Sequence, residues 1–172
     1  MERFRRAFFA YPALPAEISG TIKAASEILK QKTDRIGLVT WPQMDTFGAS
    51  IPDEVKLRIR ESDFVVVDIT RPNLNVYYES GYAIGLGKPI APVVNAAFGN
   101  AIADIQRDGL FDNIGYRAYE NSVELSSILS DPPSTILTDL HARPLNAQQP
   151  LFILDALRKT DFRNAIISSV KD

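Results

Sequence analysis

One glutamate in the sequence stands among residues that would perturb its affinity for a proton. Glu79 lies in the segment DITRPNLNVYYESGYAIGLGKPI, residues 68–90, where its neighbours along a helix are apolar or aromatic. A glutamate in such surroundings either finds a partner or has a shifted pKa, and a shifted pKa is what a catalytic carboxylate needs. The alternative is a first-turn glutamate that the helix dipole stabilises. The residues alone leave these two interpretations about even, with Glu79 as the candidate catalytic residue.

Other polar side chains of this segment could hold a ligand. Asp68 follows three valines and should emerge at the carboxyl end of a strand, where an Asx turn or a helix cap would also explain it. Asn73 and Asn75 supply turn and helix-cap chemistry. The structural role outweighs the functional one for these residues, and all three are retained as candidates for ligand binding.

Three aromatic residues are candidates for contact with a flat ring. Tyr11 and Trp41 each precede a proline at the end of an expected strand, which places them at the mouth of a ligand crevice. Tyr82 belongs to the apolar and aromatic wall around Glu79. The full set of candidate binding residues is Tyr11, Trp41, Asp68, Asn73, Asn75 and Tyr82.

Two glycines stand inside the expected helix. Gly81 and Gly85 are one turn apart, and each costs roughly 1 kcal/mol there relative to alanine. We therefore expect a neighbouring strand or a ligand to approach the helix backbone closely. The glycines do not form a Rossmann phosphate loop, and the chain has no GxxxxGK[ST] motif, so no dedicated glycine loop for phosphate is predicted.

Composition narrows the class of protein. The chain has 172 residues, 45% of them hydrophobic and 23% charged, as in ordinary globular proteins. A net charge of −2 leaves no electrostatic footprint for nucleic acid or an anionic membrane. Zero cysteines and a single histidine, His141, argue against a disulfide scaffold, a metal site and a Ser-His-Asp triad. No apolar run has the length of a membrane span, so a soluble, cytoplasmic protein is predicted.

The elements that position these residues alternate along the chain. Apolar runs predict strands at 4–11, 35–41, 63–69, 88–94 and 114–119, and helical spacing predicts helices at 16–32, 51–62, 75–86 and 121–130. This order predicts an α/β domain: a flavodoxin-like three-layer sandwich with a central five-stranded parallel sheet. The strand 63–69 should lie at the centre because it is apolar on both faces, and Pro92 predicts that the second half of 88–94 leaves the sheet. Ligands of such sheets bind beyond the carboxyl ends of the strands.

The amino-acid composition changes after this domain. Residues 1–130 form the predicted α/β domain, and residues 131–172 a Pro-rich, polar linker followed by a C-terminal helical segment. The segment carries an apolar stripe, and it either packs on the α/β core or begins a further domain. The stripe consists of Leu154, Leu157, Ile166 and Val170.

The residues around Glu79 resemble those of a known group of proteins. FFAYP in the first strand, a strand ending in Asp, and NxNVYYESGYAIGLGKP resemble the nucleoside 2-deoxyribosyltransferase-like group and its relatives in the TIR (Toll/interleukin-1 receptor) superfamily. The resemblance follows the order of elements over most of the α/β domain, but its specific part is short. It implies a flavodoxin-like fold that acts on N-glycosidic bonds of nucleosides or NAD. It also implies that Glu79, followed by Gly81, Ala83 and Gly87-Lys88-Pro89, is the catalytic residue.

One departure from the pattern bears on the substrate. Deoxyribosyltransferases carry extra aspartates before the glutamate, whereas this chain has Asn73 and Asn75. The resemblance therefore favours hydrolysis of NAD or a related nucleotide, as in TIR-like effectors of bacterial immunity, with NAD as substrate and no cofactor. Asp68 is expected to hold the ribose hydroxyls, and Tyr11 or Trp41 to stack on a base.

The resemblance also implies partners and leaves alternatives open. Self-association into a homo-oligomer is expected, together with a sensor domain or a protein partner. The first alternative is a nucleoside 2-deoxyribosyltransferase. The second is a non-catalytic module that binds nucleotides or other proteins, because a fold does not determine a function.

Overall fold

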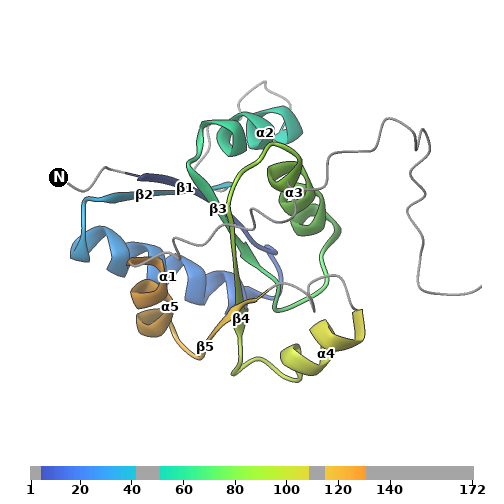
Figure 1. Cartoon of the computed structure of the whole chain (residues 1–172). Helices are drawn as coiled ribbons and strands as arrows, with labels where there is room; N and C mark the ends of the chain where they lie inside the picture. Colours follow the sequence, from blue (N-terminus) through green and yellow to red (C-terminus); the bar gives the residue numbers. More distant parts are fainter. Residues whose placement is uncertain (1–4, 42–50, 109–114, 131–172) are drawn as a thin grey trace, which may run out of the picture. The chain divides into compact units, whose positions relative to one another are not determined.

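The computed structural model describes residues 5–41, 51–108 and 115–130, in which strands and helices alternate (Figure 1). Every strand and helix expected between residues 4 and 130 is present, with ends shifted by a few residues. The predicted linker and the apolar stripe at 131–172 lie outside the described residues. The elements are β1 (Arg5–Ala10), α1 (Ala16–Lys32), β2 (Ile36–Thr40), α2 (Ile51–Glu61), β3 (Phe64–Asp68), α3 (Leu74–Gly85), β4 (Ile90–Asn95), α4 (Ala101–Asp108), β5 (Arg117–Tyr119) and α5 (Ser122–Ser130).

The sheet has the predicted flavodoxin-like topology. Its strand order is β2-β1-β3-β4-β5, and every pair is parallel. All five residues of β3 are buried, as expected for a strand covered on both faces. The prediction that the valine-rich strand is central is confirmed.

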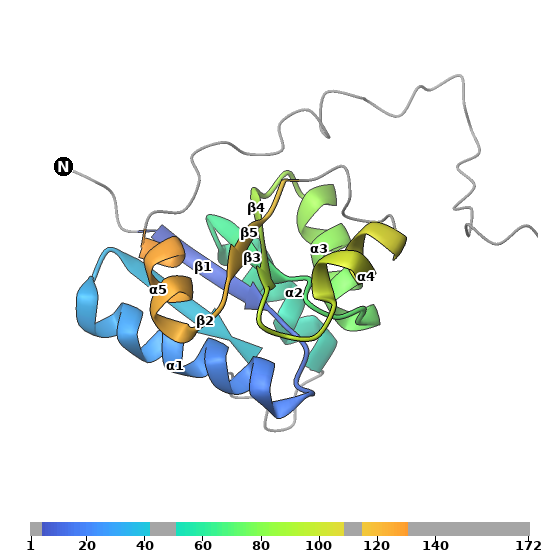
Figure 2. The same ribbon diagram turned by 90° about the horizontal axis from the view of Figure 1, so that it is seen from below.

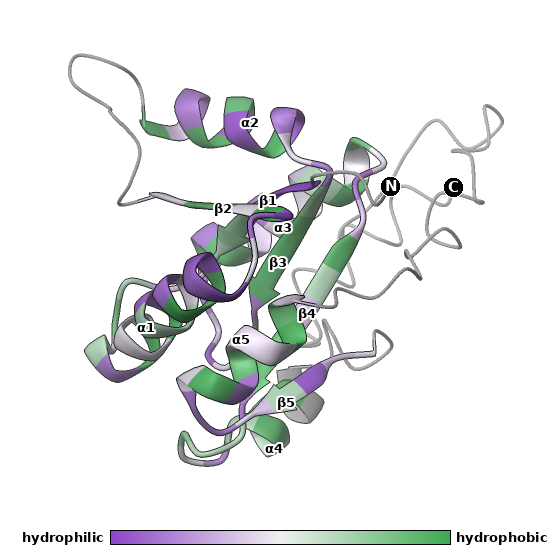
Figure 3. Ribbon diagram, turned by 90° about the vertical axis from the view of Figure 1, so that its left-hand side faces the viewer, coloured by the Kyte–Doolittle hydropathy of each residue, from purple (hydrophilic) through white to green (hydrophobic). Residues whose placement is uncertain are grey.

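Helices cover both faces of the sheet, which gives three layers (Figures 1 and 2). Alternate residues of a strand point to opposite faces, so Phe9 and Val66 pack with α1 and α5, while Phe8 and Val65 pack with α2, α3 and α4. Hydrophobic residues run along β3, whereas α1 and α2 also carry hydrophilic residues (Figure 3). The two buried clusters on either side of the sheet form the core.

Pro92 does not end the pairing of β4, and that prediction is wrong. Pro92 lies opposite Val67, and the next residue pairs with Asp68. The N–H groups of β3 and its continuation reach the carbonyl oxygens of Pro89 and Val93, so residues of that parity face β3. Pro92 has the other parity and faces β5, which pairs with β4 only from Val93 onward. Its missing N–H therefore removes no ladder bond.

The glycines of α3 have two different roles. Gly87 has φ 76°, the left-handed conformation that ends a helix, and its N–H donates to the carbonyl of Ile84 at 3.0 Å. At Gly81 and Gly85, an added Cβ would meet no atom within 4 Å. The expectation that a neighbouring strand approaches the backbone there is wrong.

Helix α4 was not predicted from the sequence. Its buried contacts come from Ala101 and Ile105, one turn apart, which join the cluster under α2 and α3. A helix of eight residues with one described pair of buried positions is too short a pattern to identify by periodicity.

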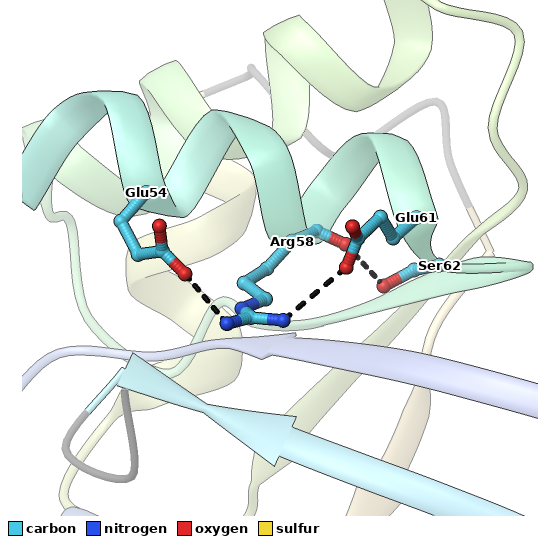
Figure 4. A network of polar contacts seen from close by, with 4 residues as sticks. All are labelled: Glu54, Arg58, Glu61 and Ser62. Atoms are coloured by element: carbon cyan, nitrogen blue, oxygen red, sulfur yellow. Dashed lines mark hydrogen bonds and ion pairs between the residues drawn. The ribbon is translucent and has the colours of Figure 1, made fainter. Parts of the chain in front are cut away.

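Helix α2 carries a network of ion pairs on its surface (Figure 4). The guanidinium of Arg58 lies 2.7 Å from the carboxylate of Glu54 and 3.2 Å from that of Glu61. The hydroxyl of Ser62 donates to the Arg58 carbonyl at 2.7 Å, which closes the end of the helix. The pair with Glu61 is exposed, and pairs of this kind contribute only about 0.2–1 kcal/mol, whereas the side chain of Glu54 is only 16% exposed.

Candidate active site

A pocket of about 410 Å³ opens at the carboxyl edge of the sheet. Its volume lies in the range of small-molecule sites, roughly 300–1,000 Å³. The pocket brings together the predicted residues Tyr11, Trp41, Asn73, Asn75 and Glu79. The other described residues that line it are Pro12, Ala13, Leu14, Ile51 and Val55.

The parallel sheet explains why these distant residues meet. Tyr11 directly follows β1, and Trp41 directly follows β2. Asn73, Asn75 and Glu79 come from the start of α3, which follows β3. Because the carboxyl ends of parallel strands share one edge, the segments that leave β1, β2 and β3 converge there.

Asn73 begins α3, which changes the position of Glu79 along the helix. The Oδ1 atom of Asn73 accepts hydrogen bonds from the backbone N–H groups of Asn75 at 3.0 Å and Val76 at 3.1 Å. Glu79 thus lies six residues beyond the cap, in the second turn. The helix dipole acts mainly within the first turn, so it does not explain a glutamate here.

Glu79 is a desolvated carboxylate without a partner. It is half-buried in the pocket wall, and within the described part of the chain no hydrogen bond or ion pair involves its side chain. Burial raises the pKa of Glu79 from 4.5 to about 7. Near neutral pH the group therefore exchanges readily between its charged and neutral forms, as the sequence analysis expected for a catalytic carboxylate.

Asp68 lies outside this pocket. Its carboxylate is fully buried and accepts hydrogen bonds from the Tyr119 hydroxyl at 2.6 Å and the Thr70 backbone N–H at 3.0 Å. Burial raises the pKa of Asp68, and these hydrogen bonds partly offset the shift. The geometry assigns Asp68 to the scaffold that joins β3 to β5, and it does not support the expected contact with ribose.

Tyr82 also points away from the pocket. Its hydroxyl accepts a hydrogen bond from Nε of Arg60 at 2.8 Å, which links α3 to α2. Its ring stacks on Tyr78, with centroids 6.3 Å apart and planes at 9°. Tyr82 is not among the described residues that line the pocket, so direct contact with a ligand is not supported.

Trp41 is the aromatic residue of the pocket that is open to stacking. It is 39% exposed, whereas Tyr11 is only 4% exposed. An exposed indole at the pocket wall can receive a flat ring on its face.

The apolar wall of the pocket was missed in the sequence analysis. Residues 12–14 follow β1, and Ile51 and Val55 occupy the first turns of α2. Their side chains carry no chemical signal by type. The rule that ligands bind beyond the strand ends would have found residues 12–14.

The described residues form neither a cluster of metal ligands nor a membrane-spanning helix. No three Asp, Glu or His side chains there gather as metal ligands would. No helix there is both long enough and apolar enough to cross a bilayer.

Comparisons with known proteins give one sequence relative and several structural ones. No family model matches the chain. A stretch of 66 residues, 38% of the chain, is 33% identical to the 5-hydroxymethyl-dUMP N-hydrolase of Mus musculus, and it spans 38% of that protein.

Three solved structures resemble the fold at low sequence identity. A conserved protein from Enterococcus faecalis V583 has a TM-score of 0.49 at 16% identity, over 72% of this chain and 96% of that one. The CMP N-glycosidase of Clostridium botulinum has a TM-score of 0.48 at 19% identity, over 73% and 98%. A 2-desoxiribosyltransferase from Leishmania mexicana has a TM-score of 0.44 at 14% identity, over 80% and 95%.

Proposed function

We propose that this chain is an enzyme that hydrolyses the N-glycosidic bond of a nucleotide, with Glu79 as the catalytic carboxylate. The observation that carries the proposal is the side chain of Glu79, which is desolvated in a pocket, without a partner among the described residues, and has a pKa raised to about 7. The partial match to a hydrolase of a deoxynucleoside monophosphate supports the class of bond and substrate.

The chemistry needs a negative charge beside the sugar. When the bond between C1′ and the base nitrogen breaks, the base leaves with the electron pair and positive charge spreads over C1′ and the ring oxygen. A carboxylate next to C1′ stabilises this charge or bonds to the carbon transiently. Water then adds its oxygen to C1′ and releases a proton. The ionised form of Glu79 performs this role, so activity should rise as pH increases through about 7.

The walls of the pocket suit the two parts of a nucleoside. The apolar wall with Trp41 suits a flat base. Glu79, Asn73 and Asn75 also line the pocket, and polar residues of this kind suit sugar oxygens. Glu79 is the carboxylate among the described lining residues, and no lysine or arginine is among them.

Two substrates fit this description. Nicotinamide leaves NAD as a neutral group and needs no protonation, which suits a wall with one described carboxylate. The sequence relative instead favours a nucleoside 5′-monophosphate. The finer part of the proposal, a TIR-like effector of bacterial immunity that acts on NAD as a homo-oligomer, rests on the residue pattern around Glu79.

Release of the free base tests the proposal. The full chain is incubated separately with NAD, with ribonucleoside monophosphates and with deoxyribonucleoside monophosphates, and the products are separated by chromatography. The expected result is, from at least one substrate, a free base with the corresponding sugar phosphate or, from NAD, nicotinamide with ADP-ribose; the Glu79→Gln variant is the matched control. Transfer of the sugar to an added base would favour a deoxyribosyltransferase. Binding without turnover would favour a non-catalytic module and overturn the proposal.

A further inference from the structure

The ring of Tyr11 is enclosed by the core. It packs edge-on against Phe9, with centroids 5.5 Å apart and planes at 73°, in the cluster that α1 and α5 cover. With 4% of the residue exposed, neither face of the ring is open to a base. This geometry leaves no room for the stacking expected from the sequence, and the hydroxyl is the polar group that the side chain still offers.

The hydroxyl of Tyr11 has no hydrogen-bond partner among the residues that the structure describes. Thr40 lies near enough to temper the pKa of Tyr11, which burial raises, but no bond of acceptable geometry forms between them. A buried hydroxyl without a partner costs about 1–3 kcal/mol. Such groups are few in native proteins, and each requires a reason.

A second buried tyrosine shows how the fold treats a structural hydroxyl. Tyr119 is 1% exposed, and its hydroxyl donates to Asp68 at 2.6 Å. Tyr119 is not among the described residues that line the pocket, whereas Tyr11 is. Tyr11 therefore combines a buried, unsatisfied hydroxyl with a place in the lining of the pocket, and Tyr119 does not.

We propose that the Tyr11 hydroxyl is a specificity-determining group, which donates a hydrogen bond to an acceptor oxygen of the bound nucleotide. The inference rests on the proposed function and deepens it, because Tyr11 and Glu79 line the same pocket. The ligand class is a nucleotide with a hydroxyl or carbonyl oxygen near the glycosidic bond. Such an oxygen would satisfy the hydroxyl that the folded chain leaves unpaired.

The direction of the hydrogen bond follows from the state of the phenol. Burial raises the pKa of Tyr11 above its ordinary value, so the group keeps its proton at neutral pH and can donate. Besides the ring oxygen that all nucleotides share, the acceptors near the glycosidic bond are the 2′-hydroxyl of a ribose and the C2 carbonyl of a pyrimidine. These two sources differ between common nucleotides, so binding measurements can separate them.

The test uses Tyr11→Phe, which keeps the ring and removes only the hydroxyl. Binding of UMP, dUMP and dAMP is measured by calorimetry in a Glu79→Gln background, so that no ligand is consumed. Loss of the hydrogen bond should weaken binding about 10-fold. A loss for UMP alone assigns the 2′-hydroxyl, a loss for UMP and dUMP assigns a base carbonyl, and an equal loss for all three assigns an oxygen common to them.

Thermal stability separates this role from a structural one. Tyr11→Phe should melt at the same temperature as the parent or higher, because no hydrogen bond is lost, while Tyr119→Phe should melt lower. Equal binding by Tyr11→Phe and its parent overturns this inference alone, as does a melting temperature that falls as far as that of Tyr119→Phe. A parent protein that binds none of the probes, together with a wild-type chain that hydrolyses neither these nucleotides nor NAD, overturns the proposed function along with the inference.

Discussion

The same edge of the sheet holds two pairs of a buried tyrosine and a carboxylate. Beyond β3 and β5, the Tyr119 hydroxyl donates to Asp68 at 2.6 Å. Beyond β1 and at the start of α3, Tyr11 and Glu79 line a pocket, and neither side chain has a hydrogen-bond partner among the described residues. The first pair joins strands, and the second stands open to a ligand.

Desolvation alone does not distinguish these two regions. Burial raises the pKa of Asp68 and that of Glu79 alike. The difference is that Asp68 accepts hydrogen bonds from Tyr119 and Thr70, whereas Glu79 lines a pocket and has no partner among the described residues. A perturbed pKa therefore indicates a site only where the group also faces a cavity and lacks a partner.

The largest expected effect comes from Glu79→Gln. Turnover should fall by about 100-fold or more, because the variant cannot stabilise a developing positive charge. Base release at saturating substrate is the measurement. Retention of activity would remove Glu79 from the catalytic role.

The same variant should become more stable than the wild type as the pH rises. The folded state holds the proton of Glu79 more tightly than the unfolded state, since its pKa rises from 4.5 to about 7. Relative to the variant, the wild type therefore loses stability between pH 4.5 and 7, by at most about 3.5 kcal/mol at about 1.4 kcal/mol per pKa unit. Urea unfolding at pH 4 and pH 8 should show equal stability at pH 4 and a more stable variant at pH 8. A variant that is less stable at pH 8 would mean that the carboxylate has a stabilising partner.

Substitution in the hydrogen-bonded pair Tyr119 and Asp68 should instead lower stability and leave activity unchanged. Tyr119→Phe removes a hydrogen bond to a buried carboxylate, which should lower the free energy of unfolding by about 1.5–3 kcal/mol. Urea unfolding gives this loss, and kcat/KM at the pocket should stay near the wild-type value. A loss of activity without a loss of stability would reverse the assignment of the two regions.

Substitution of Gly81 tests whether a ligand approaches the backbone of α3 near Glu79. Open space surrounds the position of a Cβ there, so Gly81→Ala should stabilise the helix by roughly 1 kcal/mol. Gly87→Ala is the matched control, because its φ of 76° should make alanine destabilising by a similar amount. Melting temperatures test both signs. If Gly81→Ala gains stability but loses substrate binding, a ligand approaches the helix backbone at Gly81.

The smallest effect is expected in the partly buried ion-pair network of α2. Arg58→Met keeps the aliphatic stem and removes the ion pairs to Glu54 and Glu61. The loss of stability should be no more than about 1 kcal/mol and should shrink in high salt. A change in kcat/KM in this variant would connect the α2 surface to the pocket.

Much of the fold could be predicted from local patterns. The run Val65, Val66 and Val67 identified the central strand, and helical spacing fixed α1 at 16–32. These patterns are local because burial on one or both faces sets the spacing of apolar residues. Helix α4 was not predicted because its pattern of buried residues is too short. The pairing of Pro92 was not predicted because it depends on where β5 begins.

The candidate site was only partly predictable for a different reason. Sequence alone determined the residue types: a carboxylate with apolar neighbours, a capping asparagine and aromatic residues at strand ends. The tertiary structure decided which of them have partners, since Asp68 meets Tyr119 across 51 residues and Tyr82 meets Arg60 across 22. Such partnerships arise from packing between distant segments, and no local pattern encodes them. Whether a polar group is satisfied or left facing a pocket is therefore a property of the folded chain.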